Sequence, residues 1–315
     1  MSRILYTFIT LLFTLETIAE ISVIPAPLSI KETQNEYRSG TKIEICYNPL
    51  LKNEAEYLQS IFTKEGLQCA LATGIKTKNS IVLDLSSKIK GKEAYSLETS
   101  SQTIHISASS PTGIFYGIQT LRQLIRIDNK QIVVPGVSIQ DRPSFPWRAF
   151  MLDECRHFKG KECVKQLLDE MAFLKMNTFH WHLTDDQGWR IEIKKYPKLT
   201  SVGATRPYTM VGYKTFHAPI IPDNTVHQGY YTQDDIREIV AYAQKRFVTI
   251  IPEIELPGHS SAAVAAYPEL SCGIKNRYEV VKTFGIFDNV FCPNEKTFRF
   301  LEDVFSEVES LLRNG

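Results

Sequence analysis

The sequence has no excess of charge of either sign. Its 315 residues contain 36 Lys and Arg against 35 Asp and Glu, which leaves a net charge of +1. Proteins that bind nucleic acid or anionic membranes need a strongly basic surface, so the composition argues against both kinds of partner. The hydrophobic fraction of 43% is ordinary for a globular protein.

Short motifs that mark metal or cofactor sites are also missing. None of the six cysteines forms a CxxC pair, so a zinc site built on thiolates is not indicated. No glycine-rich phosphate loop follows a predicted strand, which argues against a nucleotide cofactor. The sequence contains no internal repeats and no low-complexity segments. We therefore expect neither a metal nor a cofactor.

Long apolar runs are absent except at the start of the chain. Arg3 precedes a mainly apolar stretch at 4–15, and Thr17-Ile18-Ala19 is typical of a cleavage site. The stretch is shorter than the roughly 20 residues that cross a bilayer, so residues 1–19 are predicted to be a secretory signal peptide. The protein is then expected to be exported, to the periplasm, the cell surface or the medium, without a membrane span.

Export permits disulfides. Cys272 and Cys292 bracket a glycine-bearing, loop-like stretch between two predicted helical segments, and we predict that they are bonded to each other. Two free, buried thiols are the alternative. Most of the other cysteines are expected to be buried as small hydrophobic side chains.

The hydrophobic pattern divides the chain into two domains. At 20–142, strands predicted at 42–47, 80–85 and 102–108 mix with helices at 53–67 and 110–125, which is typical of a small α+β domain. A linker with two prolines follows at 141–146. At 143–315 the pattern alternates strand and helix, as in the first part of a parallel α/β fold, either a barrel or a doubly wound sheet.

Three strands are predicted in this second part, at 147–152, 177–183 and 247–251. Helices are predicted at 161–175 and 295–312, and Thr232 with Asp235 indicates a capping box that opens another helix. A long polar excursion at 197–229 separates the second strand from that helix.

Polar side chains follow each of the three strands: residues 153–157 after the first, Asp185 and Asp186 after the second, and Glu253, Glu255 and His259 after the third. Because parallel strands end at the same face of a sheet, these groups are expected to converge. Asp185 and His259 are then placed to form a carboxylate–imidazole pair. For the two aspartates alone, a solvated turn is the alternative.

The second strand also offers two histidines. Alternation places His180 and His182 on one face, which would suit a metal-dependent barrel hydrolase. They lie among Phe179, Trp181 and Leu183, where packed, hydrogen-bonded histidines are the more frequent explanation. No further ligand cluster accompanies them, so the metal site remains the weaker hypothesis.

Three blocks of sequence carry a family resemblance: WRAFMLDECRHF at 147–158, NTFHWHLTDDQGWRIEIKKYPKLTSVGA at 177–204 and IPEIELPGHSSAAVAAYPEL at 251–270. In this order they resemble glycoside hydrolase family 20, the β-N-acetylhexosaminidases. GIFYGIQTLRQLI and VPGVSIQDRPSFPWR resemble the N-terminal α+β domain of that family. The resemblance covers nearly everything after the predicted signal peptide.

The resemblance implies a (β/α)8 TIM barrel and an exo-acting hydrolase. Its substrate would be a glycan or chitooligosaccharide with a terminal β-linked N-acetylglucosamine or N-acetylgalactosamine. The implied mechanism is retaining and substrate-assisted: the sugar's own 2-acetamido oxygen attacks the anomeric carbon, so the protein supplies an acid but no nucleophile.

The resemblance also implies residue roles. Arg148 matches the arginine that grips the 3- and 4-hydroxyls of the terminal sugar. Asp185 and His259 match the pair that hydrogen-bonds toward the acid glutamate. Glu255 stands at a substrate-binding position where the family usually has aspartate, and it would contact Arg148 with a longer side chain.

The acid glutamate and its neighbouring aspartate come in this family from a GGDE-type block after the fourth barrel strand. No GDE occurs in the 315 residues, and the helix predicted at 295–312 precedes that strand. The chain is therefore expected to be truncated before the acid, inactive as given and poorly soluble. A catalytically dead sugar-binding protein is the alternative.

Overall fold

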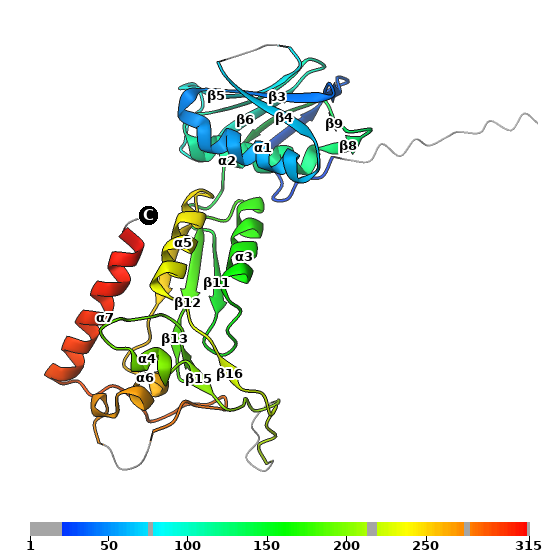
Figure 1. Cartoon of the computed structure of the whole chain (residues 1–315). Helices are drawn as coiled ribbons and strands as arrows, with labels where there is room; N and C mark the ends of the chain where they lie inside the picture. The colour runs from blue at the N-terminus through cyan, green and yellow to red at the C-terminus, as the bar shows by residue number, and fades with distance from the viewer. Residues whose placement is uncertain (1–20, 75–77, 213–218, 274–277, 314–315) are drawn as a thin grey trace, which may run out of the picture.

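Two hydrophobic cores organise the chain, one built mainly before residue 142 and one after it, and the ribbon accordingly divides into two parts (Figure 1). The computed structural model describes residues 21–74, 78–212, 219–273 and 278–313. The predicted signal peptide at 1–19 lies outside these ranges. Among the described residues, no helix combines the length and apolar character that a membrane span requires.

A seven-stranded mixed sheet forms the first core, in the order β1-β10-β6-β7-β5-β3-β4. Its strands are β1 (Ser29–Glu32), β3 (Lys42–Tyr47), β4 (Gln68–Thr73), β5 (Ser80–Leu85), β6 (Tyr95–Thr99), β7 (Thr103–Ala108) and β10 (Val137–Asp141). A smaller sheet beside it joins β2 (Tyr37–Arg38), β9 (Gln131–Val134) and β8 (Arg126–Asp128).

Two helices, α1 (Lys52–Lys64) and α2 (Pro111–Leu124), cover the face of the large sheet that is turned toward the second part (Figure 1). The short 3-10 helix η1 (Pro49–Leu51) leads into α1. Ser110 caps α2 by accepting a hydrogen bond from the amide of Gly113, which satisfies one of the free amides of the first turn. Most of α2 is buried. The α+β arrangement expected for this region is confirmed.

Three parallel strands, β11 (Ala149–Asp153), β12 (Thr178–His182) and β17 (Thr249–Glu253), form the sheet of the second part, with β12 in the centre. Asp153 pairs with His182 and His182 with Glu253, so the three carboxyl ends are level. Helices α3 (Lys161–Phe173), α5 (Gln233–Gln244) and α7 (Glu295–Arg313) accompany them (Figure 1). This is a partial, barrel-like α/β unit, as expected.

The remaining elements are short: β13 (Thr184–Asp185), β14 (Gly188–Trp189), α4 (Lys198–Ser201), β15 (Thr205–Arg206), β16 (His227–Gln228), α6 (Ser261–Ala266) and η2 (Pro268–Leu270). The predicted capping box at the start of α5 is present, with Thr232 and Asp235 bonded reciprocally. Cys272 and Cys292 form the predicted disulfide, with 4.5 Å between their Cα atoms. Cys163, in contrast, is an exposed free thiol.

A buried ion pair joins the two parts. Lys175, just after α3, donates from Nζ to Asp141 Oδ2 at 3.0 Å and to the hydroxyl of Tyr95 at 2.9 Å. The two charged side chains are only 9% and 11% exposed. Phe115 of α2 also packs on Phe247 of the second part, with ring centroids 5.3 Å apart. The carboxylate at the end of β10 is therefore held by a cation from the second part.

We predict that Lys175→Met lowers the free energy of unfolding by about 3 kcal/mol, because a buried carboxylate that loses its cation is strongly destabilising. Urea unfolding followed by fluorescence measures the loss. The double variant Lys175→Met, Asp141→Asn is the matched control and is expected to recover part of it. Equal stability of Lys175→Met and wild type would show that the pair does not hold the two parts together.

Candidate functional site

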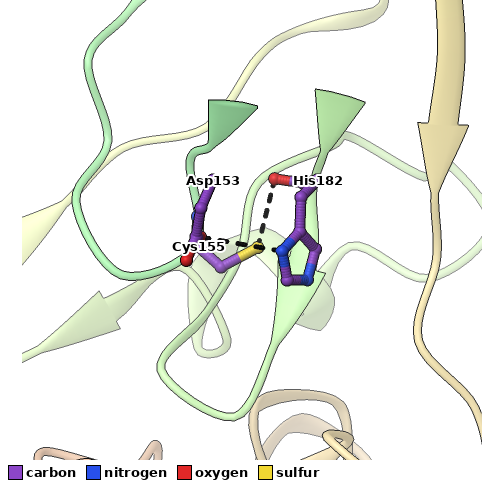
Figure 2. Close-up of side chains that lie close together, drawn as sticks. All are labelled: Asp153, Cys155 and His182. Carbon is purple, nitrogen blue, oxygen red and sulfur yellow. Dashed lines mark hydrogen bonds and ion pairs between the residues drawn. The ribbon is translucent and has the colours of Figure 1, made fainter. Parts of the chain in front are cut away.

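The candidate site lies at the carboxyl ends of the three parallel strands. Figure 2 shows Asp153 and Cys155, from the end of β11, facing His182 at the end of β12. The hairpin β13–β14 and the segment after β17 add further polar groups to the same end. The convergence expected from the strand direction is therefore observed.

Asp185 is the centre of the site. Its side chain is 1% exposed, and Arg156 Nη2 lies 2.6 Å from its Oδ2. His182 Nε2 is 3.3 Å from the same oxygen, while His259 Nδ1 is 3.2 Å from Oδ1. Burial alone would raise the pKa of Asp185, but the hydrogen bonds and positive charges around it outweigh burial and hold that pKa below its usual value. Asp185 is therefore an anion at neutral pH.

The predicted pair of Asp185 and His259 is formed, and Asp186 shares the imidazole. His259 Nδ1 lies 3.1 Å from Asp186 Oδ2, while Asp186 Oδ1 accepts hydrogen bonds from the amide and hydroxyl of Ser261. Partial burial opposes protonation of His259, but the two carboxylates prevail and raise its pKa. The imidazole is 48% exposed, so it remains open to a ligand.

His182 takes a larger part in the site than the sequence indicated. It is the last residue of β12, and its buried Nε2 lies 3.0 Å from the carbonyl oxygen of Thr184 as well as near Asp185. Burial disfavours its charged form, yet Asp185 and the nearby carboxylates raise its pKa. Its position at the strand end was the available signal, because catalytic groups gather there.

The structure does not join His180 and His182 in one metal site. Within the described residues, the groups close enough to share an ion are Asp153 with Cys155 and His182, His182 with Glu253 and Glu255, and Asp185 with Asp186 and His259. None of them contains His180, whose Nε2 is instead 2.7 Å from Glu253 Oε2. The weaker hypothesis, a metal held by both histidines, is therefore not supported.

The group of Asp153, Cys155 and His182 is poorly suited to a cation. Arg156 Nη1 already lies 2.6 Å from Asp153 Oδ2. The Cys155 thiol donates to the carbonyl oxygen of His182 at 3.3 Å, and burial raises the pKa of that thiol well above its usual value. Only the thiolate is a strong metal ligand. These residues therefore belong to the hydrogen-bond network around Asp185.

Glu253 and Glu255 lie side by side at the end of β17. Burial, followed by the hydrogen bond and charge of Glu253, raises the pKa of Glu255 to about 7. His182 Nε2, 3.7 Å from Glu255 Oε1, offsets this only in part. Glu255 therefore keeps its proton to a higher pH than an ordinary glutamate does. Its contacts are with these groups and not with Arg148, contrary to our expectation.

Arg148 lies at the other end of the sheet. It precedes β11, and its Nη2 donates to Glu93 Oε1 at 2.9 Å and to the Tyr116 hydroxyl at 3.1 Å. Five strand residues separate it from the carboxyl end, or roughly 16 Å at the usual rise. The structure therefore does not bring Arg148 together with Asp185 and His259, and it corrects the expected role of Arg148 to one of joining the second part to the first.

The arginine inside the site is Arg156. Besides Asp185 and Asp153, it reaches Gln187, whose Oε1 accepts from Arg156 Nε at 2.9 Å. The side chain is 31% exposed. Nε and Nη1 each donate one hydrogen bond, to Gln187 and Asp153, and Nη2 lies beside Asp185, so the guanidinium keeps further N–H groups for a ligand. Strand direction would have selected Arg156, since it follows β11 while Arg148 precedes it.

The loops around the site are held by a second, fully buried arginine. Arg190 donates to five backbone carbonyl oxygens, those of Glu154, Cys155, Gln187, Ala204 and Gly229. A Cβ at Gly188 would lie 2.3 Å from its Nη2, so a glycine is required there. Arg190 therefore fixes four separate chain segments behind the site.

Comparison with known proteins gives consistent matches. The family model described as "Glycosyl hydrolase family 20, catalytic domain" matches residues 145–314, and "Glycosyl hydrolase family 20, domain 2" matches residues 20–142. A beta-hexosaminidase of Porphyromonas gingivalis is 39% identical over 92% of this chain and 37% of its own length. One from Vibrio furnissii is 43% identical over 69% of this chain and 35% of its own length. The chain thus spans little more than a third of these relatives.

Solved structures agree in fold. An exo-beta-N-acetylglucosaminidase from Vibrio harveyi, in complex with N-acetylglucosamine, has a TM-score of 0.79 and 31% identity over 92% of this chain and 45% of its own. An N-acetyl-beta-hexosaminidase from Streptomyces plicatus, in complex with thio-NAglucal, has a TM-score of 0.78 and 34% identity over 92% and 56%.

The raised pKa of Glu255 makes stability depend on pH. Between the ordinary value of 4.5 and the folded value of about 7, the folded state binds more protons at this group than the unfolded chain does, so stability falls as pH rises through that window. Glu255→Gln removes this term. We expect it to be more stable than wild type at pH 8 by on the order of 1–2 kcal/mol, and nearly equal to it at pH 4.5.

Thermal unfolding at both pH values measures the difference. Glu302→Gln, on the exposed side of α7, is the matched control. It should change the stability at pH 4.5 and at pH 8 by the same amount. A gain for Glu255→Gln at pH 4.5 as large as that at pH 8 would contradict a protonated Glu255.

Proposed function

Because the chain belongs to glycosyl hydrolase family 20, we propose that it builds the terminal-sugar site of an exo-acting β-N-acetylhexosaminidase. The substrate class is a glycan or chitooligosaccharide that ends in a β-linked N-acetylhexosamine. The Vibrio harveyi structure, which holds N-acetylglucosamine, supports this class of ligand. We also infer that the protein is exported, from the predicted signal peptide and the Cys272–Cys292 disulfide.

The geometry of Arg156 is the observation that supports the proposal most. Its guanidinium is held on one side by Asp153 and Asp185, and it is partly exposed on the other. A planar guanidinium presents neighbouring N–H groups in a fixed fork, which matches two adjacent sugar hydroxyls. Arg156 therefore takes the sugar-gripping role that we had expected of Arg148.

Asp185 and His259 supply the second half of the proposal. In the substrate-assisted reaction, the acetamido oxygen attacks the anomeric carbon while an acid protonates the departing glycosidic oxygen. Asp185 keeps the imidazole of His259 oriented and favours its protonated form. A protonated imidazole can stabilise the ionised state of a neighbouring acid after that acid has given up its proton. The pair thus tunes the acid and does not replace it.

Comparison of Arg156→Met with Arg148→Met tests at which end of the sheet the sugar binds. We expect Arg156→Met to weaken N-acetylglucosamine binding at least about tenfold, since hydrogen bonds from a charged group are lost. Arg148→Met removes the same charge from the other end and is expected to leave the dissociation constant within about twofold. Isothermal titration calorimetry measures both. Loss of binding only in Arg148→Met would place the sugar at the amino ends of the strands.

A polypeptide of residues 1–315 is expected to bind the sugar without hydrolysing a substrate. The resemblance places the acid in a GDE-type block, which residues 1–315 do not contain, and general-acid assistance contributes about 10²- to 10⁴-fold. We therefore predict that a polypeptide of residues 1–315 binds N-acetylglucosamine but releases no chromophore from a nitrophenyl N-acetyl-β-glucosaminide. Measurable release would indicate another proton donor, and its loss in Glu255→Gln would identify Glu255.

A chimera separates an enzyme from a catalytically dead sugar-binding protein. Residues 1–315 are joined to the remaining C-terminal part of the Porphyromonas gingivalis relative, and turnover is measured with the same substrate. Restored turnover that Asp185→Asn reduces supports the hydrolase. Sugar binding without turnover in a folded chimera supports the dead binding protein.

A further inference from the structure

We propose that Gln187 is a positioning residue that couples the disulfide-closed segment 278–292 to the guanidinium of Arg156. Its amide forms a bridge between the two. Oε1 accepts from Arg156 Nε at 2.9 Å, and Nε2 donates to the carbonyl oxygen of Thr283 at 3.0 Å. Arg156 Nε can only donate and a carbonyl oxygen can only accept, so this amide orientation alone satisfies both partners.

Segment 278–292 is attached to the site by further backbone contacts. The amide of Val281 donates to the carbonyl oxygen of Asp186 at 3.0 Å, directly beside Gln187. The amide of Phe291 donates to the carbonyl oxygen of Pro257 at 2.9 Å, and Ser260 Oγ donates to that of Asn289 at 3.0 Å. The disulfide ties Cys292, the last residue of the segment, to Cys272. Thr283 therefore has a fixed position relative to the strand ends.

The coupling matters because Arg156 has a long side chain with several rotatable bonds. Asp153 and Asp185 each hold one terminal nitrogen, whereas Gln187 holds Nε and so fixes the plane of the guanidinium. The N–H groups that remain for a ligand gain their direction from that plane. The consequence for sugar affinity rests on the proposed function; the coupling itself does not.

The test of the coupling needs no sugar. In full-chain protein labelled with ¹⁵N-arginine, the Arg156 Nε–H resonance, assigned with Arg156→Lys, reports the hydrogen bond to Gln187. We expect Gln187→Leu to shift or broaden it, and the disulfide-free variant Cys272→Ser, Cys292→Ser to shift it in the same direction. Combining the two changes should add little, because both act through one bridge.

Two further variants sharpen the result. Gln187→Glu keeps an acceptor for Arg156 but loses the donor to Thr283, so removal of the disulfide should no longer move the Arg156 resonance. Gln59→Leu is the matched control, since Gln59 Nε2 also donates to a backbone carbonyl oxygen, that of Cys69 at 3.0 Å, far along the chain in the first domain. It should leave the Arg156 resonance unchanged.

Sugar affinity provides the second readout. We expect Gln187→Leu and the disulfide-free variant to weaken N-acetylglucosamine binding by roughly two- to tenfold each, and again not additively. If removal of the disulfide from an otherwise wild-type chain leaves the Arg156 resonance unchanged, the proposal is overturned, regardless of the sugar affinity. If instead the resonance responds as expected but wild type binds no sugar, the coupling stands and the proposed function fails.

Discussion

A carboxylate buried away from water is stable as an anion only when cations and N–H groups surround it, and Asp185 is such a group. Its partners come from different segments: Arg156 follows β11, His182 ends β12, and His259 follows β17. The ionised form is therefore favourable only when all three strand ends meet in their native register. One buried charge links the order of the strands to the geometry of the site, and its neighbours Asp186 and Gln187 extend that order to segment 278–292.

The sequence predicted the parts of the site that depend on strand direction. Asp185 and His259 follow strands that could be recognised locally, and their pairing was confirmed. The expected role of Arg148 was wrong because this residue precedes β11, and the amino end of a parallel strand lies at the opposite end of the sheet from the site. The contribution of His182 to the site was not predicted, because the alternation of side chains along a strand does not distinguish a histidine packed within the strand from one at its end. Gln187 carried no signal, since its role depends on Thr283, 96 residues away.

The fold shows the same division between local and distant interactions. The capping box of α5, the strand at 42–47 and the helix at 161–173 were predictable because each depends on neighbouring residues. The order of the large sheet was not, because β1 pairs with β10 across more than 100 residues. The contacts between the two parts could not be predicted from the sequence either. Glu93 with Arg148 and Asp141 with Lys175 are ion pairs that only the assembled structure brings together.

Arg190 has a consequence for which changes the loops around the site can tolerate. It grips the backbone oxygens of Glu154, Cys155, Gln187, Ala204 and Gly229, and no side chain among them takes part in its hydrogen bonds. Side chains in these loops can therefore change while the main chain keeps its hydrogen bonds to Arg190, provided that Gly188 and Gly229 remain glycine, since a Cβ at Gly229 would lie 2.2 Å from Phe158 Cδ1, and that Gln187 keeps its bridge to Arg156. A lysine at position 190 would offer three N–H groups in place of five and would release some of the loops. The side chains of these loops can thus evolve while Arg190 holds the loop backbones in place.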